Sequence, residues 1–110
     1  MSNDPDIILI DDLTVLYRHV GSGTCIYVVG SSTENELILA AALNAVCDSL
    51  GALLRDRYDR TTLLENFELL QLTLDEIADD GVILEIDVDC IKNRVLMRVC
   101  VENARILLRQ

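Results

Sequence analysis

The first third of the chain alternates short apolar runs with turn residues, a pattern that predicts β-strands. Residues 7–10 form a β-branched apolar run that ends at two aspartates, and residues 13–20 alternate loosely between apolar and polar side chains. Residues 24–30 are apolar on both faces, as expected for a central strand. Gly21 and Gly23 can adopt the positive φ of a tight connection between the last two strands. The pattern therefore predicts a three-stranded antiparallel meander.

The spacing of apolar residues then changes to steps of three and four, which predicts a helix ending near Leu54. The hydroxyl residues at 31–33 are candidate caps, and Glu34 and Glu36 suit the positive end of the helix dipole. Apolar side chains cover nearly the whole circumference, so this helix is expected to be buried on several sides. Arg55 is expected in its last turn, where a cation suits the dipole.

A second helix is predicted from Asp59 to about residue 77, with Asp59 or Thr61 as its N-cap. Gly81 is placed to act as its left-handed C-cap. Residues 82–86 form a short extended segment, residues 88–99 predict one more short helix, and residues 101–110 give no clear pattern. The predicted fold class is α+β, with an antiparallel sheet packed against two main helices and a short C-terminal helix, in a single domain spanning residues 1–110.

The amino-acid composition bears on which classes of molecule this chain can bind. Nineteen acidic and nine basic residues give a net charge of -10, which repels nucleic-acid phosphates and anionic lipid headgroups. The longest apolar run, residues 37–43, is broken by Asn44 and is too short to span a membrane. The first residues are acidic where a signal peptide would be basic, so a cytosolic or nuclear protein is expected. A hydrophobic content of 51% in 110 residues favours an apolar partner surface.

The residues that could carry catalysis do not form a recognisable site. His19 is the only histidine, and the acidic pairs at 11–12 and 79–80 are expected to be turn residues. No cysteine pair has the spacing of a metal site or a redox motif, so all four cysteines are expected to be buried and reduced: Cys25, Cys47, Cys90 and Cys100. We therefore expect no cofactor, no metal and no enzymatic activity. A small thiol enzyme using Cys25 or Cys90 is kept as a remote alternative.

The second predicted helix carries a candidate interface. Its apolar stripe is expected to face the core, as amphipathic helices usually do. Leu69 and Leu72 lie beside that stripe and widen it beyond what one contact face requires. These two leucines are the predicted partner-interface residues.

Beyond periodicity, several blocks resemble the zeta subunits of coatomer, which belong to the small-subunit family of adaptor complexes. In residues 27–37 a strand leads through Gly-Ser-Ser into Glu-Asn-Glu-Leu at the start of a helix. Residues 47–50, 63–66 and 74–77 continue the resemblance, and Asp-Gly-Val-Ile-Leu-Glu at 80–85 separates zeta chains from their relatives. Small sigma chains of clathrin adaptors share Glu-Asn-Glu-Leu and Leu-Asp-Glu, and they are kept as the alternative family.

The resemblance implies a longin-like (SNARE-like) fold, with a five-stranded antiparallel sheet flanked by helices. It further implies a non-catalytic subunit that packs against the coatomer gamma subunit. The coat is recruited to Golgi membranes by an ADP-ribosylation factor GTPase, and it carries cargo from Golgi to endoplasmic reticulum and within the Golgi. The implied location is the cytoplasm and, peripherally, Golgi and vesicle membranes. A sigma-type chain would instead read cargo sorting motifs.

The chain also departs from the zeta pattern. The family's opening hairpin and first helix have no counterpart before Asp6, so three of the five strands are expected, and the loop after Arg98 is largely missing. The family's first strand lies beside the strand that ends at Gly30, so this strand is expected to have an unpaired edge. We therefore hypothesise that the chain is marginally stable alone and depends on a partner or on self-association, or is a shortened isoform.

Overall fold

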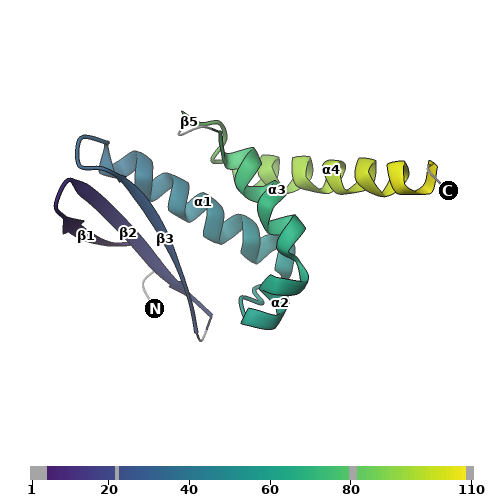
Figure 1. The fold of residues 1–110 in the computed structure, drawn as a ribbon, viewed down its shortest axis with the longest axis horizontal. Coiled ribbons are helices and arrows are strands. Elements are labelled where there is room, and N and C mark those ends of the chain that lie inside the picture. Colours follow the sequence, from purple (N-terminus) through teal and green to yellow (C-terminus); the bar gives the residue numbers. More distant parts are fainter. Residues whose placement is uncertain (1–4, 22, 80–81, 109–110) are drawn as a thin grey trace.

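The chain begins with a three-stranded sheet, followed by helices that pack on it (Figure 1). The structure is a computed structural model that describes residues 5–21, 23–79 and 82–108. Strands β1 (Asp6–Ile10), β2 (Leu13–Val20) and β3 (Thr24–Ser31) are antiparallel neighbours in the order β1-β2-β3. The predicted meander is confirmed, with strand ends that differ from the prediction by one residue.

The two turns of the meander use different residues to reach positive φ. Asp11, with φ 52°, makes the turn between β1 and β2, and Gly21, with φ 63°, begins the turn between β2 and β3. Aspartate tolerates the left-handed region better than most side chains do. Ser32 then donates a backbone hydrogen bond to the Asp12 carbonyl at 2.8 Å, which holds the end of β3 against the first turn. The acidic pair at 11–12 is therefore a turn, as predicted.

Helix α1 (Glu36–Leu54) is the centre of the fold. It contacts β2, β3, α3 and α4, and it contributes to both clusters of buried apolar residues. In one cluster Leu43 and Cys47 pack with Leu16 of the sheet, and in the other Leu50 packs with residues of the later helices. By length and composition α1 could cross a membrane, but 56% of its apolar window is buried inside the fold, as in a core helix.

The ends of α1 differ from those predicted. The N-cap is Asn35, whose side-chain oxygen accepts a hydrogen bond from Leu37 N at 2.9 Å. The predicted hydroxyl caps are otherwise engaged, since the hydroxyls of Ser31 and Thr33 bond each other at 2.9 Å. Arg55 is not in the last turn but follows it as the C-cap, in the left-handed region with φ 55°.

The predicted second helix is divided in two. Helix α2 (Arg60–Glu65) and helix α3 (Phe67–Ile77) are separated by Asn66, whose φ and ψ of -111° and 30° leave the helical region. The Asn66 side-chain amide donates to the Thr62 carbonyl at 2.8 Å, and the same carbonyl also accepts from the Asn66 backbone N–H at 3.1 Å. Asp59 is the N-cap of α2, which confirms one of the two predicted caps.

The last third contains a small hairpin and a long helix. Strands β4 (Ala78–Asp79) and β5 (Val82–Ile83) pair with each other. The C-cap of α3 is Ala78, in the extended region, so the prediction of Gly81 was wrong; Gly81 itself lies outside the described residues. Helix α4 (Val88–Leu108) has 21 residues, so the predicted short helix is much longer and includes most of the segment left unassigned. No Gly or Pro interrupts residues 88–108, so nothing local ends the helix. In Figure 1, α4 extends away from the body.

The packing gives an α+β layer arrangement with helices on one face of the sheet. Thr14, Leu16 and Val20 of β2 are buried on the side of the sheet that packs on α1. Ile91 and Val95 at the start of α4 are fully buried with Ile77 of α3. The predicted fold class is confirmed, with the main sheet three strands wide and a separate two-stranded hairpin.

Candidate partner interface

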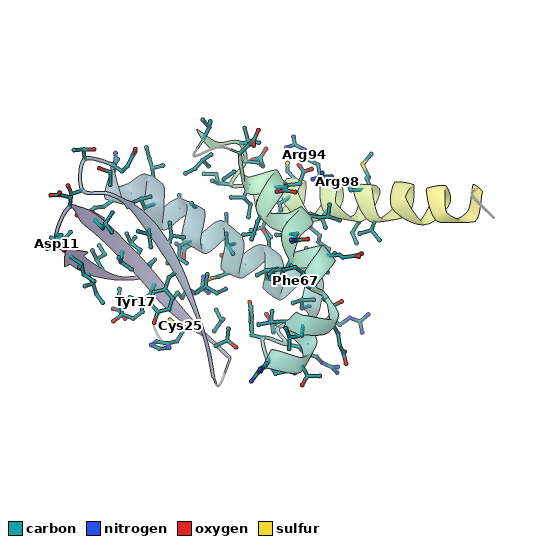
Figure 2. All side chains as sticks on the ribbon, viewed as in Figure 1. Asp11, Tyr17, Cys25, Phe67, Arg94 and Arg98 are labelled. Carbon is teal, nitrogen blue, oxygen red and sulfur yellow. The ribbon has the colours of Figure 1, made fainter. Side chains whose placement is uncertain are left out.

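The face of the sheet that points away from α1 is apolar and largely exposed. Cross-strand partners share a face, so the register places β1, β2 and β3 residues in continuous rows. We define the outer face by seven apolar or aromatic residues of these rows: Ile8, Ile10, Leu13, Val15, Tyr17, Tyr27 and Val29. Figure 2 shows Tyr17, and beside it Cys25, on the side of the sheet opposite α1.

The exposure of this face is high for apolar side chains. The exposed fraction is 60% for Tyr27, 57% for Val29 and 46% for Leu13. Ile8 and Ile10 of β1 are 41% and 52% exposed, so the apolar surface continues to the sheet edge. Contiguous exposed apolar patches on folded proteins mark partner surfaces. The outer face is therefore the strongest candidate interface among the described residues.

Aromatic residues stand at the centre of the outer face. The rings of Tyr17 and Tyr27 face each other across two strands with centroids 5.7 Å apart, and His19 packs edge-on against Tyr17 at 5.8 Å. A hydrogen bond and charge repulsion with Cys25 raise the pKa of Tyr27. Tyrosines are enriched at protein interfaces because they combine a large apolar ring with a polar tip.

Polar bonds on the opposite face fix the sheet to α1. Arg18 donates to Asp48 Oδ1 at 3.0 Å and to Asn44 Oδ1 at 3.2 Å, both on α1. The Tyr58 hydroxyl donates to the Cys47 carbonyl at 2.8 Å, and the Thr24 hydroxyl donates to the Tyr58 carbonyl. These bonds tie β2, β3 and the loop after α1 together. The sheet that carries the outer face is thus held in place by hydrogen bonds to α1 and to the loop after it.

The two predicted interface residues lie elsewhere. Leu69 and Leu72 of α3 are half-buried and pack against the core cluster that contains Ile77. Their role as partner contacts stays a prediction. The sequence did carry a signal for the outer face, since Leu13, Val15 and Tyr17 alternate in β2. That signal could not show which face of the sheet the helices leave uncovered.

The environments of the cysteines only partly match the prediction. All four are free; Cys47 is buried and Cys25 half-buried, but Cys90 and Cys100 are exposed. Ile91 and Val95 take the buried side of α4, which leaves Cys90 facing solvent. The prediction of burial was therefore wrong for Cys90 and for Cys100. Asp87 and, more weakly, Glu85 raise the pKa of Cys90, and burial raises the pKa of Cys47 to about 11. Both thiols are therefore poor nucleophiles at neutral pH.

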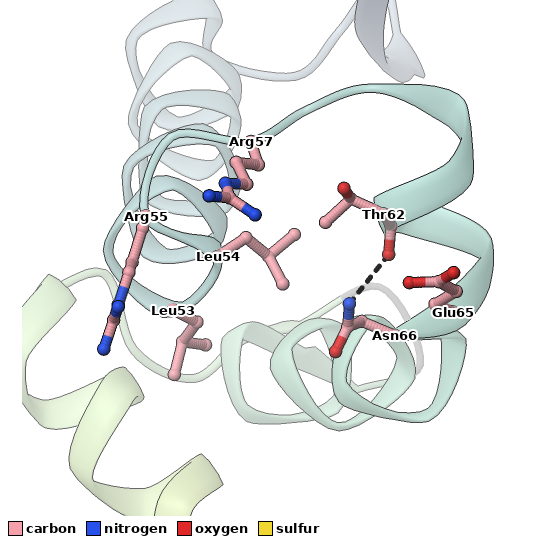
Figure 3. A pocket seen from close by; sticks show the side chains of 7 residues that line it. All are labelled: Leu53, Leu54, Arg55, Arg57, Thr62, Glu65 and Asn66. Carbon is pink, nitrogen blue, oxygen red and sulfur yellow. Dashed lines mark hydrogen bonds between the residues drawn. The ribbon is translucent and has the colours of Figure 1, made fainter.

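A small cavity lies between the end of α1 and helix α2 (Figure 3). Its volume is about 290 Å³, and its lining includes Arg55, Arg57 and Glu65. The Asn66 side chain that borders it is already bonded to the Thr62 carbonyl. In the part of the chain that the structure describes, no group of three or more His, Cys, Asp or Glu side chains could hold a metal ion.

Several known proteins similar to this chain are zeta subunits of coatomer. The chain is 47% identical over 95 residues to human coatomer subunit zeta-1, covering 86% of this chain and 53% of the human protein. It is 37% identical over 92 residues to rice coatomer subunit zeta-1, covering 84% and 51%, respectively. It is also 37% identical over 92 residues to coatomer subunit zeta of Saccharomyces cerevisiae, covering 84% and 48%. The chain spans about half the length of these relatives.

A family model shows the wider relationship. Residues 2–103 match the model described as clathrin adaptor complex small chain, which covers nearly all of the sequence. The α+β arrangement of antiparallel sheet and helices agrees with the longin-like fold expected for such chains. The resemblance read from the blocks around residues 27–37 and 80–85 is thereby confirmed. The chain belongs to the family of clathrin adaptor complex small chains.

Proposed function

We propose that this chain is a non-catalytic subunit of a coatomer vesicle coat, assembled with the gamma subunit through its outer sheet face. The observation that carries the proposal is the similarity to coatomer zeta subunits, at 47% identity over 86% of the chain. The coat would associate with an ADP-ribosylation factor GTPase on Golgi and vesicle membranes, in transport from Golgi to endoplasmic reticulum and within the Golgi. The subunit itself would be cytoplasmic and peripheral to the membrane, and would act as one domain.

Two physical properties support assembly with a protein partner over direct contact with lipid or nucleic acid. The outer face offers aromatic and β-branched side chains that would leave water on assembly, such as Tyr27 at 60% exposure. The net charge of -10 opposes adhesion to phosphates and anionic headgroups. A partner subunit that carries the membrane contact is compatible with both properties.

The first experiment is co-expression with the trunk of a coatomer gamma subunit, followed by size-exclusion chromatography. We expect a stoichiometric complex. The double variant Leu13→Glu/Tyr27→Glu places two charges on the outer face and is expected to abolish it, because burying unpaired carboxylates is costly. Met97→Glu, at a side chain 68% exposed on α4, is the matched control and should leave the complex intact.

The controls separate loss of folding from loss of binding. Circular dichroism must show the same helix content and a cooperative melt in both variants and in the unchanged chain. Failure of the unchanged chain to bind, beside a full-length zeta subunit that binds normally, would overturn the coat assignment. Loss of the complex in Met97→Glu, with the double variant unaffected, would move the interface away from the outer face.

The clathrin-adaptor alternative makes a different prediction. A sigma-type chain would take part in the recognition of cargo sorting peptides. No feature of the described residues requires this chain to bind such peptides. Titration with a fluorescent peptide carrying a dileucine sorting motif would detect such binding by anisotropy. We expect no saturable binding. Saturable binding that a dialanine peptide lacks would favour the adaptor function.

A further inference from the structure

Four hydroxyl residues of the chain share one local pattern, a glutamate three residues after the hydroxyl: Ser31, Thr33, Thr62 and Thr73. Protein kinases that favour acidic substrates recognise such a carboxylate by charge complementarity with basic residues of their own substrate groove. The pattern alone does not choose among the four residues, because so short a motif also occurs by chance. The structure, however, gives the four hydroxyls very different environments.

Two of these hydroxyls lie in helices and are hydrogen-bonded there. Thr73 of α3 is fully buried, and its hydroxyl donates to the Leu69 carbonyl at 2.8 Å. Thr62 of α2 is half-buried, and its hydroxyl donates to Oδ1 of the N-cap Asp59 at 2.8 Å. A kinase binds its substrate as an extended segment, so either residue would first have to leave its helix by local unfolding. Both are therefore poor phosphate acceptors in the folded chain.

The other two hydroxyls lie where β3 leads into α1, but the sheet holds Ser31. This serine is the last residue of β3 and pairs with Leu13 of β2. Its carbonyl accepts from the Glu34 N–H at 2.9 Å, and its hydroxyl accepts from the Thr33 N–H at 3.3 Å. Thr33 lies outside strand and helix, in a turn whose residues are all exposed. Its hydroxyl bonds that of Ser31 at 2.9 Å, an exposed contact that costs little to break.

The negative charge that follows Thr33 also sets it apart. Glu34 comes directly after it, and Glu36 stands three residues after it, at the first position of α1. Both glutamates are exposed. Among the four hydroxyl residues, only Thr33 has a carboxylate at both of these positions. No lysine or arginine occurs in residues 19–54, so the sequence around Thr33 is attractive to a basic substrate groove.

We propose that Thr33 is a phosphorylation site for a protein kinase that selects acidic residues after the acceptor hydroxyl. The Thr33 Oγ1 attacks the γ-phosphorus of a nucleoside triphosphate, and the bond from that phosphorus to the oxygen bridging it to the β-phosphate breaks. The nucleoside diphosphate leaves, and the hydroxyl proton passes to the catalytic base of the kinase. The proposal uses only the segment between β3 and α1, so it does not depend on the coat assignment.

The test is incubation of the folded full chain with ATP and casein kinase II, a protein kinase that selects acidic substrates. Intact mass measures the phosphate content, and mass spectrometry of proteolytic peptides locates the phosphate. We expect a single phosphate, on Thr33. Thr33→Ala should abolish its incorporation, whereas Thr33→Ser should retain it, because serine offers a hydroxyl at the same exposed position. Ser31→Ala should leave the initial rate of phosphorylation unchanged.

The role of the glutamates is tested by removing one charge at a time. Glu36→Gln should lower the initial rate about tenfold, because a carboxylate that the kinase binds is lost. Glu65→Gln removes the equivalent carboxylate after Thr62 and should have little effect, which makes it the matched control. Circular dichroism compares the helix content of the two variants. Absence of phosphate on the folded chain, a first phosphate on any residue other than Thr33, or an unchanged rate in Glu36→Gln would overturn the proposal.

Discussion

At the residue scale, the neighbours of Gly51 on α1 leave no room for a side chain at this position. The side chain of Tyr58 folds back over α1 so that its hydroxyl reaches the Cys47 carbonyl at 2.8 Å. A Cβ on Gly51 would meet the Tyr58 hydroxyl, the Tyr58 ring carbon Cζ at 3.3 Å and Asp56 Oδ1 at 2.8 Å. Glycine is therefore required for close approach, although it lies in the interior of a helix.

The substitution Gly51→Ala should lower the free energy of unfolding. Alanine gains up to ~1 kcal/mol of helix propensity over glycine, but displacing Tyr58 and Asp56 costs about 1–3 kcal/mol. Urea denaturation monitored by circular dichroism measures the difference. Gly23→Ala is the matched control, because nothing lies within 4 Å of a Cβ there. Greater stability in Gly51→Ala would show that Tyr58 moves aside freely.

The buried thiol of Cys47 links stability to alkaline pH. Burial raises its pKa from 9.0 to about 11 in the folded chain. The folded state thus holds a proton that the unfolded state releases near pH 9, so this contribution is complete below pH 9 and is lost as pH rises towards 11. The stability advantage over Cys47→Ala should therefore narrow in this window, by about 2 kcal/mol. Denaturation midpoints from pH 7 to 11 would measure it, and a constant gap would contradict the shift.

Residue-level details were only partly predictable from sequence. The Asp59 cap was foreseen, because aspartate before a helical pattern has a strong N-cap preference. The Asn35 cap was missed, since Ser31, Ser32 and Thr33 offered equally good capping chemistry. The extension of β3 to Ser31 removed that serine from the helix start. Which of several capable residues caps a helix depends on where the preceding strand ends.

At the element scale, Asn35 determines how α1 begins. Its side chain accepts from Leu37 N, one of the backbone donors that lack a helical partner. Asn35→Ala should lower the free energy of unfolding by about 1 kcal/mol, the usual cost of losing an N-cap. Thermal and urea denaturation would both detect this change.

Ser32→Ala provides the control for this prediction. Ser32 lies three residues earlier and its backbone, not its side chain, makes the bond to Asp12. Its substitution should leave stability within about 0.5 kcal/mol of the unchanged chain. Equal losses in both variants would mean that the whole 31–35 segment, and not the Asn35 cap alone, supports the start of α1.

The elements themselves were predicted more reliably than their ends. Strand alternation and turn residues define β1, β2 and β3, because a period of two is distinct from a period near 3.6. The break at Asn66 could not be predicted from an apolar stripe that continues through it, since it consists of one residue whose φ and ψ leave the helical region. The length of α4 was underestimated because helix can continue wherever no residue breaks it.

At the scale of the whole molecule, the exposed outer face and the net charge of -10 act against each other. Apolar side chains favour self-association, and like charges oppose it over distances of about one Debye length. Sequence composition predicted both tendencies. Composition could not show where the apolar surface lies, because tertiary packing alone determines which face of the sheet α1 covers.

The hypothesis that the chain depends on association predicts a response to salt. The Debye length falls from ~30 Å at 0.01 M to ~3 Å at 1 M, so high salt removes the repulsion between chains. We expect monomers at low salt and reversible association at 1 M salt, measured by sedimentation velocity. Leu13→Glu/Tyr27→Glu should remain monomeric at both. A stable, cooperatively folding monomer at every salt concentration would contradict the hypothesis.

The division of the core between two parts of the chain has a consequence for synthesis on the ribosome. The cluster of Leu16, Val20 and Leu43 is complete once α1 has emerged, because its members are close in sequence. The other cluster must wait for Ile91 and Val95 to reach Leu50 of α1. During translation of the intervening segment, one flank of α1 lacks its partners. We expect chaperones that recognise apolar helices to bind the nascent chain in this interval and to leave when α4 docks.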